Sequence, residues 1–129
     1  MPVNMLWDDA EKSILRFEYQ GKWMWEEVES AMKQANAELT TVQHRVDTIH
    51  DLTGSSGLPS NALSHASSLS RHIPAQAGIS VVTGSSTLIN TLLSVFSKVY
   101  PQFGSRYKNA STLEEAYALI ERSRASERT

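Results

Sequence analysis

The fold of this chain is decided by the stretch Asp47-Thr48-Ile49-His50-Asp51-Leu52-Thr53-Gly54-Ser55-Ser56-Gly57-Leu58. A strand-like run over residues 45–50 precedes Asp51 and a Gly-Ser-Ser-Gly segment, which predicts a turn leading toward a helix. In an α/β domain this junction lies at the carboxyl edge of a strand, where ligands and phosphate groups are usually received. No base, thiol or metal-ligand cluster accompanies the two hydroxyls. We therefore expect a bound or modified site rather than a catalytic one, made of Asp51, Ser55, Ser56 and Gly57.

The composition is typical of an ordinary globular domain. The chain has 129 residues, of which 40% are hydrophobic and 20% are charged. This length fits one domain that buries about two-thirds of the surface of its unfolded form. We expect a single domain over residues 1–129, with a core of about residues 5–122 and a polar tail that frays from about Ser123.

Charge and residue usage exclude several classes of function. The formal net charge of −2 gives no overall attraction for nucleic acid or for an anionic membrane surface. The chain has no cysteine, which rules out disulfides and thiolate chemistry. No apolar run approaches the roughly 20 residues needed to span a bilayer, and residues 1–9 do not form a secretory signal. We expect a cytoplasmic protein that carries no cofactor and no metal.

Upstream of the deciding stretch, the pattern predicts a β-hairpin and a helix. Strands are expected over residues 5–7 and 13–19, because Leu15, Phe17 and Tyr19 alternate with polar residues. A break is expected at residues 20–22. The helix expected over residues 25–39 has a single apolar face. That face consists of Trp25, Val28, Met32, Ala35 and Leu39.

Downstream, helices and strands continue to alternate. Helices are expected over residues 61–73 and 87–100, each ended by a proline, with strands over residues 79–83 and 105–108. The last helix begins with the capping-box pattern of residues 111–114. The expected core positions are Leu63, Ala66, Leu69 and Ile73, then Leu88, Leu92, Val95, Phe96 and Val99, and finally Leu113, Ala116, Leu119 and Ile120.

This order of elements predicts the fold class. Strands that alternate with helices favour a mostly parallel sheet with right-handed crossovers, and the initial hairpin adds an antiparallel pair. We therefore expect a single-domain α/β sandwich with a mixed, mostly parallel sheet and about four helices.

Three segments and the amino-terminal region together resemble the STAS superfamily, and more closely its SpoIIAA-like group. The segments are residues 46–51 with Ser55-Ser56-Gly57-Leu58, residues 77–83, and Phe103 with residues 109–116. The likeness to the SpoIIAA-like group lies in the amino-terminal stretch from residues 7–8 through residues 21–27. The resemblance as a whole covers residues 5–122.

The resemblance implies a regulatory role without enzymatic activity. In the anti-sigma-factor antagonists of this superfamily, a partner kinase phosphorylates a serine in an Asp-Ser-Ser-Gly-Leu turn. Ser55 occupies that position, Gly54 stands where the family has Asp, and Asp51 lies closer to the serines than the family's strand acid does. The resemblance therefore implies a bacterial protein-interaction module whose partner is an anti-sigma-type kinase. A solvated loop is the alternative interpretation of the turn.

The tryptophans allow a second interpretation. Trp23 and Trp25 flank the start of the first expected helix, and Trp7 lies on the first strand. They are either packing residues or an aromatic lip on a pocket or partner surface, with Met32 and the apolar helix of residues 88–99 lining a cavity behind it. SpoIIAA-like domains also resemble lipid-transfer CRAL-TRIO domains in fold. A small binding protein for an apolar metabolite or lipid is thus the alternative function, and a homodimeric structural domain is a third.

Hydrolase chemistry is not supported by the residues. His50 and Asp51 are consecutive on a strand and point to opposite faces, so Asp51 cannot orient His50 toward a serine. Leu58 takes the place of the final glycine of a Gly-x-Ser-x-Gly elbow. The second strand-to-helix turn, residues 84–87, lacks a P-loop lysine and is typical of a helix cap. We therefore expect no enzymatic activity.

Overall fold

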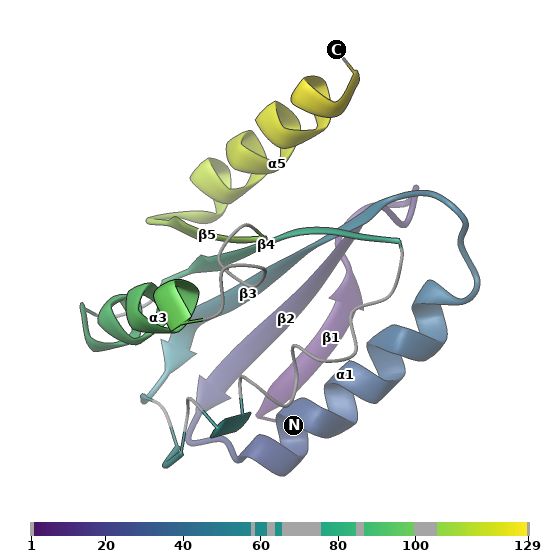
Figure 1. Ribbon diagram of the computed structural model, residues 1–129. Helices are drawn as coiled ribbons and strands as arrows, with labels where there is room; N and C mark the ends of the chain where they lie inside the picture. Colours follow the sequence, from purple (N-terminus) through teal and green to yellow (C-terminus); the bar gives the residue numbers. More distant parts are fainter. Residues whose placement is uncertain are drawn as a thin grey trace.

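A five-stranded sheet forms the centre of the computed structural model, which describes residues 2–57, 59–61, 64–65, 76–84, 87–99 and 106–128. Neighbouring strands follow the chain order β1-β2-β3-β4-β5. The first pair is antiparallel and the other three are parallel (Figure 1). The strands are β1 (Val3–Trp7), β2 (Ile14–Gly21), β3 (Val46–Ser55), β4 (Ala77–Thr83) and β5 (Tyr107–Ala110), and the helices are α1 (Trp25–Leu39), α3 (Thr87–Val99) and α5 (Leu113–Arg128). The predicted mixed sheet is confirmed.

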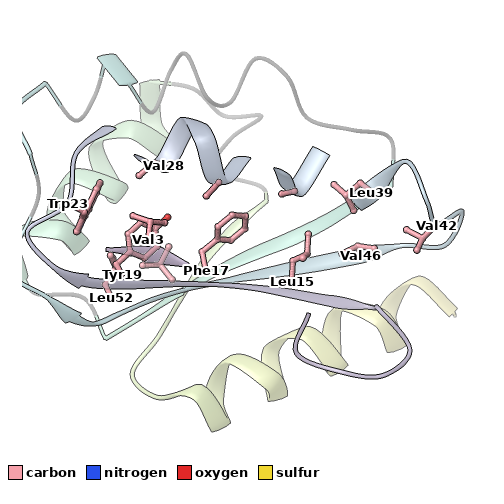
Figure 2. Close-up of a cluster of buried hydrophobic side chains, with 13 residues drawn as sticks. Val3, Leu15, Phe17, Tyr19, Trp23, Val28, Leu39, Val42, Val46 and Leu52 are labelled. Atoms are coloured by element: carbon pink, nitrogen blue, oxygen red, sulfur yellow. The ribbon is translucent and has the colours of Figure 1, made fainter. Parts of the chain in front are cut away.

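Helices α1 and α5 cover opposite faces of the sheet (Figure 1). The larger apolar cluster fills the space between α1 and the sheet, and Figure 2 shows Trp23 at one end of it and Leu39 and Val42 at the other. The smaller cluster lies on the α5 side and includes Ile49 and Ile120. Period-two alternation along β2 and β3 supplies both clusters, as expected for a sheet covered on two faces. The predicted sandwich is therefore confirmed.

Helix α1 begins and ends where the sequence pattern predicts. Glu27 returns to the helix start and accepts a hydrogen bond from the Met24 amide at 2.9 Å. This contact satisfies one of the amide groups that a helix leaves free at its first turn. Along the predicted face, Val28 is buried, whereas Trp25 and Met32 are half-buried at the rim of the larger cluster.

Two strands are longer than predicted, and this overturns the predicted turn. β2 continues through Gly21, and β3 continues to Ser55. Gly54 and Ser55 pair with Gln20 and Gly21, so they are strand residues. Polar residues are tolerated there because ladder bonds to β2 satisfy the backbone, and the side chains lie at the end of the sheet.

The apolar face predicted for α3 is wrong at two positions. Val95 and Val99 are 44% and 63% exposed. The side chains of Leu88, Leu92 and Phe96 lie outside the described residues. β5 runs two residues later than predicted, from Tyr107 to Ala110.

Most of the helix predicted over residues 61–73 also lies outside the described residues. Of that span, only residues 61, 64 and 65 are described, and residues 64 and 65 are helical. The predicted core positions Leu63, Ala66, Leu69 and Ile73 are not among them. Phe103, Ser105 and the turn positions Leu58, Ser85 and Ser86 lie outside the described residues too.

The carboxyl-terminal helix is longer than predicted. α5 extends to Arg128, so the expectation of fraying from about Ser123 is wrong. Its capping residue is Thr112, whose Oγ1 accepts a hydrogen bond from the Glu115 amide at 3.1 Å. The Glu115 carboxylate in turn accepts one from the Ser111 amide at 2.9 Å. Within the described part of the chain, no helix has the length and apolarity needed to cross a bilayer.

Candidate functional site

The end of β3 projects past its neighbour β4. Asp51 pairs with Thr83, the last residue of β4, whereas β3 continues to Ser55 beside Gly21 of β2. The chain leaves β4 through Gly84, whose φ of +72° favours glycine. A Cβ there would lie 2.3 Å from Thr53 Oγ1, so only glycine fits so close to β3.

The Ser55 hydroxyl is held inside this tip. Trp23 Nε1 donates a hydrogen bond to Ser55 Oγ at 2.8 Å. Ser55 Oγ donates to the Gly57 carbonyl at 2.9 Å and accepts from the Gly57 amide at 3.2 Å. Ser55 is half-buried. Its hydroxyl is thus engaged both as donor and as acceptor, and modification of Ser55 would break these contacts.

Ser56 is in a different environment one residue later. It is exposed, and its amide donates a hydrogen bond to the Gly21 carbonyl at 2.9 Å. Gly57 beside it is also exposed. Asp51 lies farther back on the strand, where it accepts a hydrogen bond from the Thr53 amide at 3.0 Å. Of the predicted turn residues, Ser56 therefore offers the accessible hydroxyl.

Two of the tryptophans join this site. Trp23 is buried, and its ring meets that of Trp25 edge-on at 5.0 Å. Trp25 donates from Nε1 to the Ser60 carbonyl at 2.7 Å and stacks on His65 at 5.0 Å. Met24, between the two tryptophans in sequence, is 56% exposed. We name Trp23, Met24, Trp25, Ser55 and Ser56 the carboxyl-edge site.

Trp7 and Met32 lie elsewhere. Trp7 Nε1 donates to Glu38 Oε2 at 3.3 Å, near the end of α1, whereas Trp25 begins that helix. A helix of this length places the two ends about 20 Å apart. Met32 lies in the middle of α1, half-buried against the larger cluster. The structure thus brings together the turn serines and two tryptophans, which the sequence pattern had treated as separate sites, and leaves out Trp7.

A group of aromatic side chains lies behind the carboxyl-edge site; Phe17 and Tyr19 are buried in it, and His50 and Tyr107 are half-buried. His50 stacks on Phe17 at 4.9 Å and on Tyr107 at 6.4 Å, and its Nδ1 lies 2.8 Å from the Tyr19 hydroxyl. Burial lowers the pKa of His50 to about 4. Burial also raises the pKa of Tyr19, and raises that of Tyr107 to about 12 against an opposing hydrogen bond from the Ser80 side chain.

These pKa values make the aromatic group neutral at pH 7. A neutral histidine and two protonated tyrosines pack and hydrogen-bond, but they supply no charged acid or base near neutrality. His50 shares the α1 face of β3 with Leu52, and Asp51 points to the other face, as strand alternation predicts. In the part of the chain that the structure describes, no three acidic, histidine or cysteine side chains form a metal site.

A buried ionic cluster, which sequence reasoning missed, lies at the opposite end of β3. Asp47 is fully buried. Its Oδ1 accepts from Arg45 Nε at 2.9 Å and from the Ile79 amide at 2.8 Å, and its Oδ2 accepts from Arg124 Nε at 2.8 Å. A Cβ on Gly78 would lie 2.0 Å from Asp47 Oδ1, so glycine is required beside this cluster. An acidic residue in an otherwise apolar strand was the available signal, but its partners lie far away in sequence.

Comparisons with known proteins identify the class of fold. The chain matches no protein-family model and no curated protein. Its structure is a SpoIIAA-like α/β sandwich, which confirms the predicted fold resemblance. A similar solved structure is the crystal structure of an uncharacterized protein of the DUF3478 family with a SpoIIAA-like fold, from Shewanella loihica PV-4. The TM-score is 0.64 at 16% sequence identity, and the match covers 91% of this chain and 90% of that chain. At this identity the likeness establishes the fold.

Proposed function

We propose that this chain is a non-enzymatic regulatory module that binds a protein partner at the carboxyl-edge site. The observation that carries the proposal is the hydrogen bond from Trp23 Nε1 to Ser55 Oγ. It fixes the end of β3 against the start of α1, so that Met24, Trp25 and Ser56 are presented on a rigid frame. An exposed methionine beside an amphipathic tryptophan is a typical contact pair of protein interfaces.

Ser56 is the better phosphoacceptor of the two predicted serines. Its side chain is exposed, whereas the Ser55 hydroxyl holds the tip together. A phosphate on Ser56 would add nearly two negative charges to the carboxyl-edge site. Binding of a partner there would then depend on the phosphorylation state. The SpoIIAA-like fold supports an anti-sigma-type kinase as the partner, by analogy of fold.

The phosphorylation is tested by incubating the chain with each anti-sigma-type kinase of its source organism and ATP. We expect intact-mass measurement to show one added phosphate in the unaltered chain and in Ser55→Ala, and none in Ser56→Ala. A chain that gains no mass with any of these kinases would remove the switch from the proposal.

The docking surface is tested separately with a matched pair of variants. Met24→Ser and Val99→Ser each remove an exposed apolar side chain, one inside the site and one on α3. We expect Met24→Ser to weaken binding of the kinase, measured by calorimetry, by about tenfold or more. Val99→Ser should bind like the unaltered chain, and equal effects of both variants would contradict the proposed surface.

The alternative function, binding of an apolar metabolite or lipid, is favoured by one observation. Val95 and Val99 expose apolar surface on α3, as expected for a helix that borders an apolar ligand. Native mass spectrometry of the chain purified from its own source would show a bound molecule. Protein that is empty in every preparation would count against this function.

A further inference from the structure

A pocket opens at the amino edge of the sheet, at the opposite end of β3 from the carboxyl-edge site. Its volume is about 470 Å³. Residues 43–45 before β3, residues 76–78 at the start of β4 and Glu127 of α5 line it. This volume falls within the range of small-molecule sites. We propose that the pocket binds a small carboxylate-bearing molecule, which takes the place of the Glu127 side chain against Arg45.

Arg45 is presented to the pocket with its orientation already fixed. Its Nε and Nη2 lie 2.9 Å and 2.8 Å from Asp47 Oδ1, and Nη2 also donates to Ser123 Oγ at 2.8 Å. The third nitrogen, Nη1, is the one left to contact a ligand, and it lies 2.6 Å from Glu127 Oε2. A guanidinium held in this way binds a carboxylate without losing further rotational freedom.

The charges of the cluster allow an anion in this pocket only in exchange for the Glu127 carboxylate. One buried carboxylate, Asp47, stands between two guanidinium groups, those of Arg45 and Arg124. These three groups carry a net charge of +1. Glu127 compensates this charge at Arg45, and Glu121 approaches Arg124 Nη1 at 3.9 Å. The ligand would therefore replace a compensating charge that the chain already supplies.

Glu127 is the residue of the cluster whose side chain a ligand can displace. Its side chain is 67% exposed, and it lies in the last turn of α5. It contacts Arg45 through Nη1 alone. Ion pairs of exposed carboxylates are weak, so a free carboxylate can replace this one at little cost. Asp47, by contrast, is fully buried and stays in place.

The remaining walls favour a polar and compact ligand. His44 Nε2 lies 2.9 Å from the Lys12 carbonyl, and Gln76 Nε2 donates to the carbonyls of Leu39 and Val42 at 3.2 Å each. These contacts hold the two polar side chains at the rim. Gly78 lines the pocket without a side chain, because a Cβ there would lie 2.0 Å from Asp47 Oδ1. A short molecule with one carboxylate for Arg45 and a second polar group for the rim matches these features, and glutarate is a simple probe of this kind.

Titration with glutarate at constant ionic strength, followed by amide and Arg Nε–H NMR shifts, tests the proposal. We expect the Gly78 amide and the Arg45 Nε–H signals to move, with glutaramide producing no shift. Glu127→Gln should bind glutarate about fivefold more tightly, because it removes the weak competing carboxylate. The matched variant is Glu121→Gln, since Glu121 is 69% exposed on the same helix but lies outside the pocket.

Three results would overturn the proposal. The first is equal glutarate affinity in Glu127→Gln and Glu121→Gln. The second is shifts confined to residues outside the pocket. The third is no shift at all in the folded Glu127→Gln variant. Because none of the tested variants alters Arg45 or Asp47, each can be expected to fold.

Discussion

The two ends of β3 are stabilised by different kinds of interaction. At the carboxyl edge, neutral hydrogen bonds and ring contacts hold Trp23 against Ser55. At the amino edge, a fully buried carboxylate joins two arginines, one of which is 77 residues away in sequence. The first end joins Trp23 and Ser55, which are 32 residues apart but stand out in the sequence as residue types. The second end depends on long-range pairing, which a sequence pattern does not display.

The largest expected effect concerns the amino edge. Asp47→Asn should lower the free energy of unfolding by about 3–5 kcal/mol, because it leaves Arg45 and Arg124 without their buried carboxylate. Urea unfolding at pH 7 measures this loss. The matched change Asp51→Asn, on the half-buried residue nearer the carboxyl edge, should cost less than about 1 kcal/mol. Similar losses of unfolding free energy in the two variants would contradict the difference between the two ends of β3.

A second prediction uses the lowered pKa of His50. Between pH 6.5 and about 4, the unfolded chain binds a proton at His50 that the folded chain does not. Stability from this residue is therefore present above pH 6.5 and is lost as the pH falls toward 4. The full loss is about 3 kcal/mol, from a difference of about 2.5 pKa units.

Urea unfolding between pH 4.5 and 7 measures this loss. His50→Phe should flatten the profile in that window, and the exposed His44→Asn should leave it unchanged. Asp9 affects stability in a lower range of pH. Burial alone would raise its pKa, but hydrogen bonds from Ser13 and Ile14 lower it. Its contribution is therefore lost below its ordinary pKa. An unchanged slope in His50→Phe would show that this histidine is not buried as described.

The smallest expected effect concerns the hydrogen bond of the carboxyl-edge site. Trp23→Phe removes the donor to Ser55 and should cost about 1–2 kcal/mol of unfolding free energy. Hydrogen exchange at the Gly57 amide should become faster, because the tip loses its anchor. Trp7→Phe is the comparison, since its bond to Glu38 is longer at 3.3 Å. Unaltered exchange at Gly57 in Trp23→Phe would mean that this bond does not hold the tip.

Local pattern predicted much of the fold. The period of 3.6 residues gave the limits of α1, and alternation in β2 gave its buried face, because both depend on neighbours in sequence. The length of β3 was missed, since pairing with β2 decides it and its last residues are polar. The helical end of α5 was missed for a similar reason, because the ion pair between Arg124 and buried Asp47 stabilises it.

The candidate site was predicted in pieces. Ser55, Ser56 and the tryptophans were singled out from composition, but their contact depends on the register between β2 and β3, in which Gly21 lies opposite Ser55. Val95 and Val99 show a second limit of prediction from sequence. A periodic apolar stripe indicates which side of a helix is apolar, but it does not show what covers that side.

Strand β3 itself has a further consequence. Asp47 and Ser55 are separated by eight residues of extended chain, which is about 26 Å at the rise of a parallel strand. The two proposed sites therefore lie too far apart to overlap. On these proposals, a protein at the carboxyl-edge site would leave the pocket at the amino edge open, so that both occupants would be held at once.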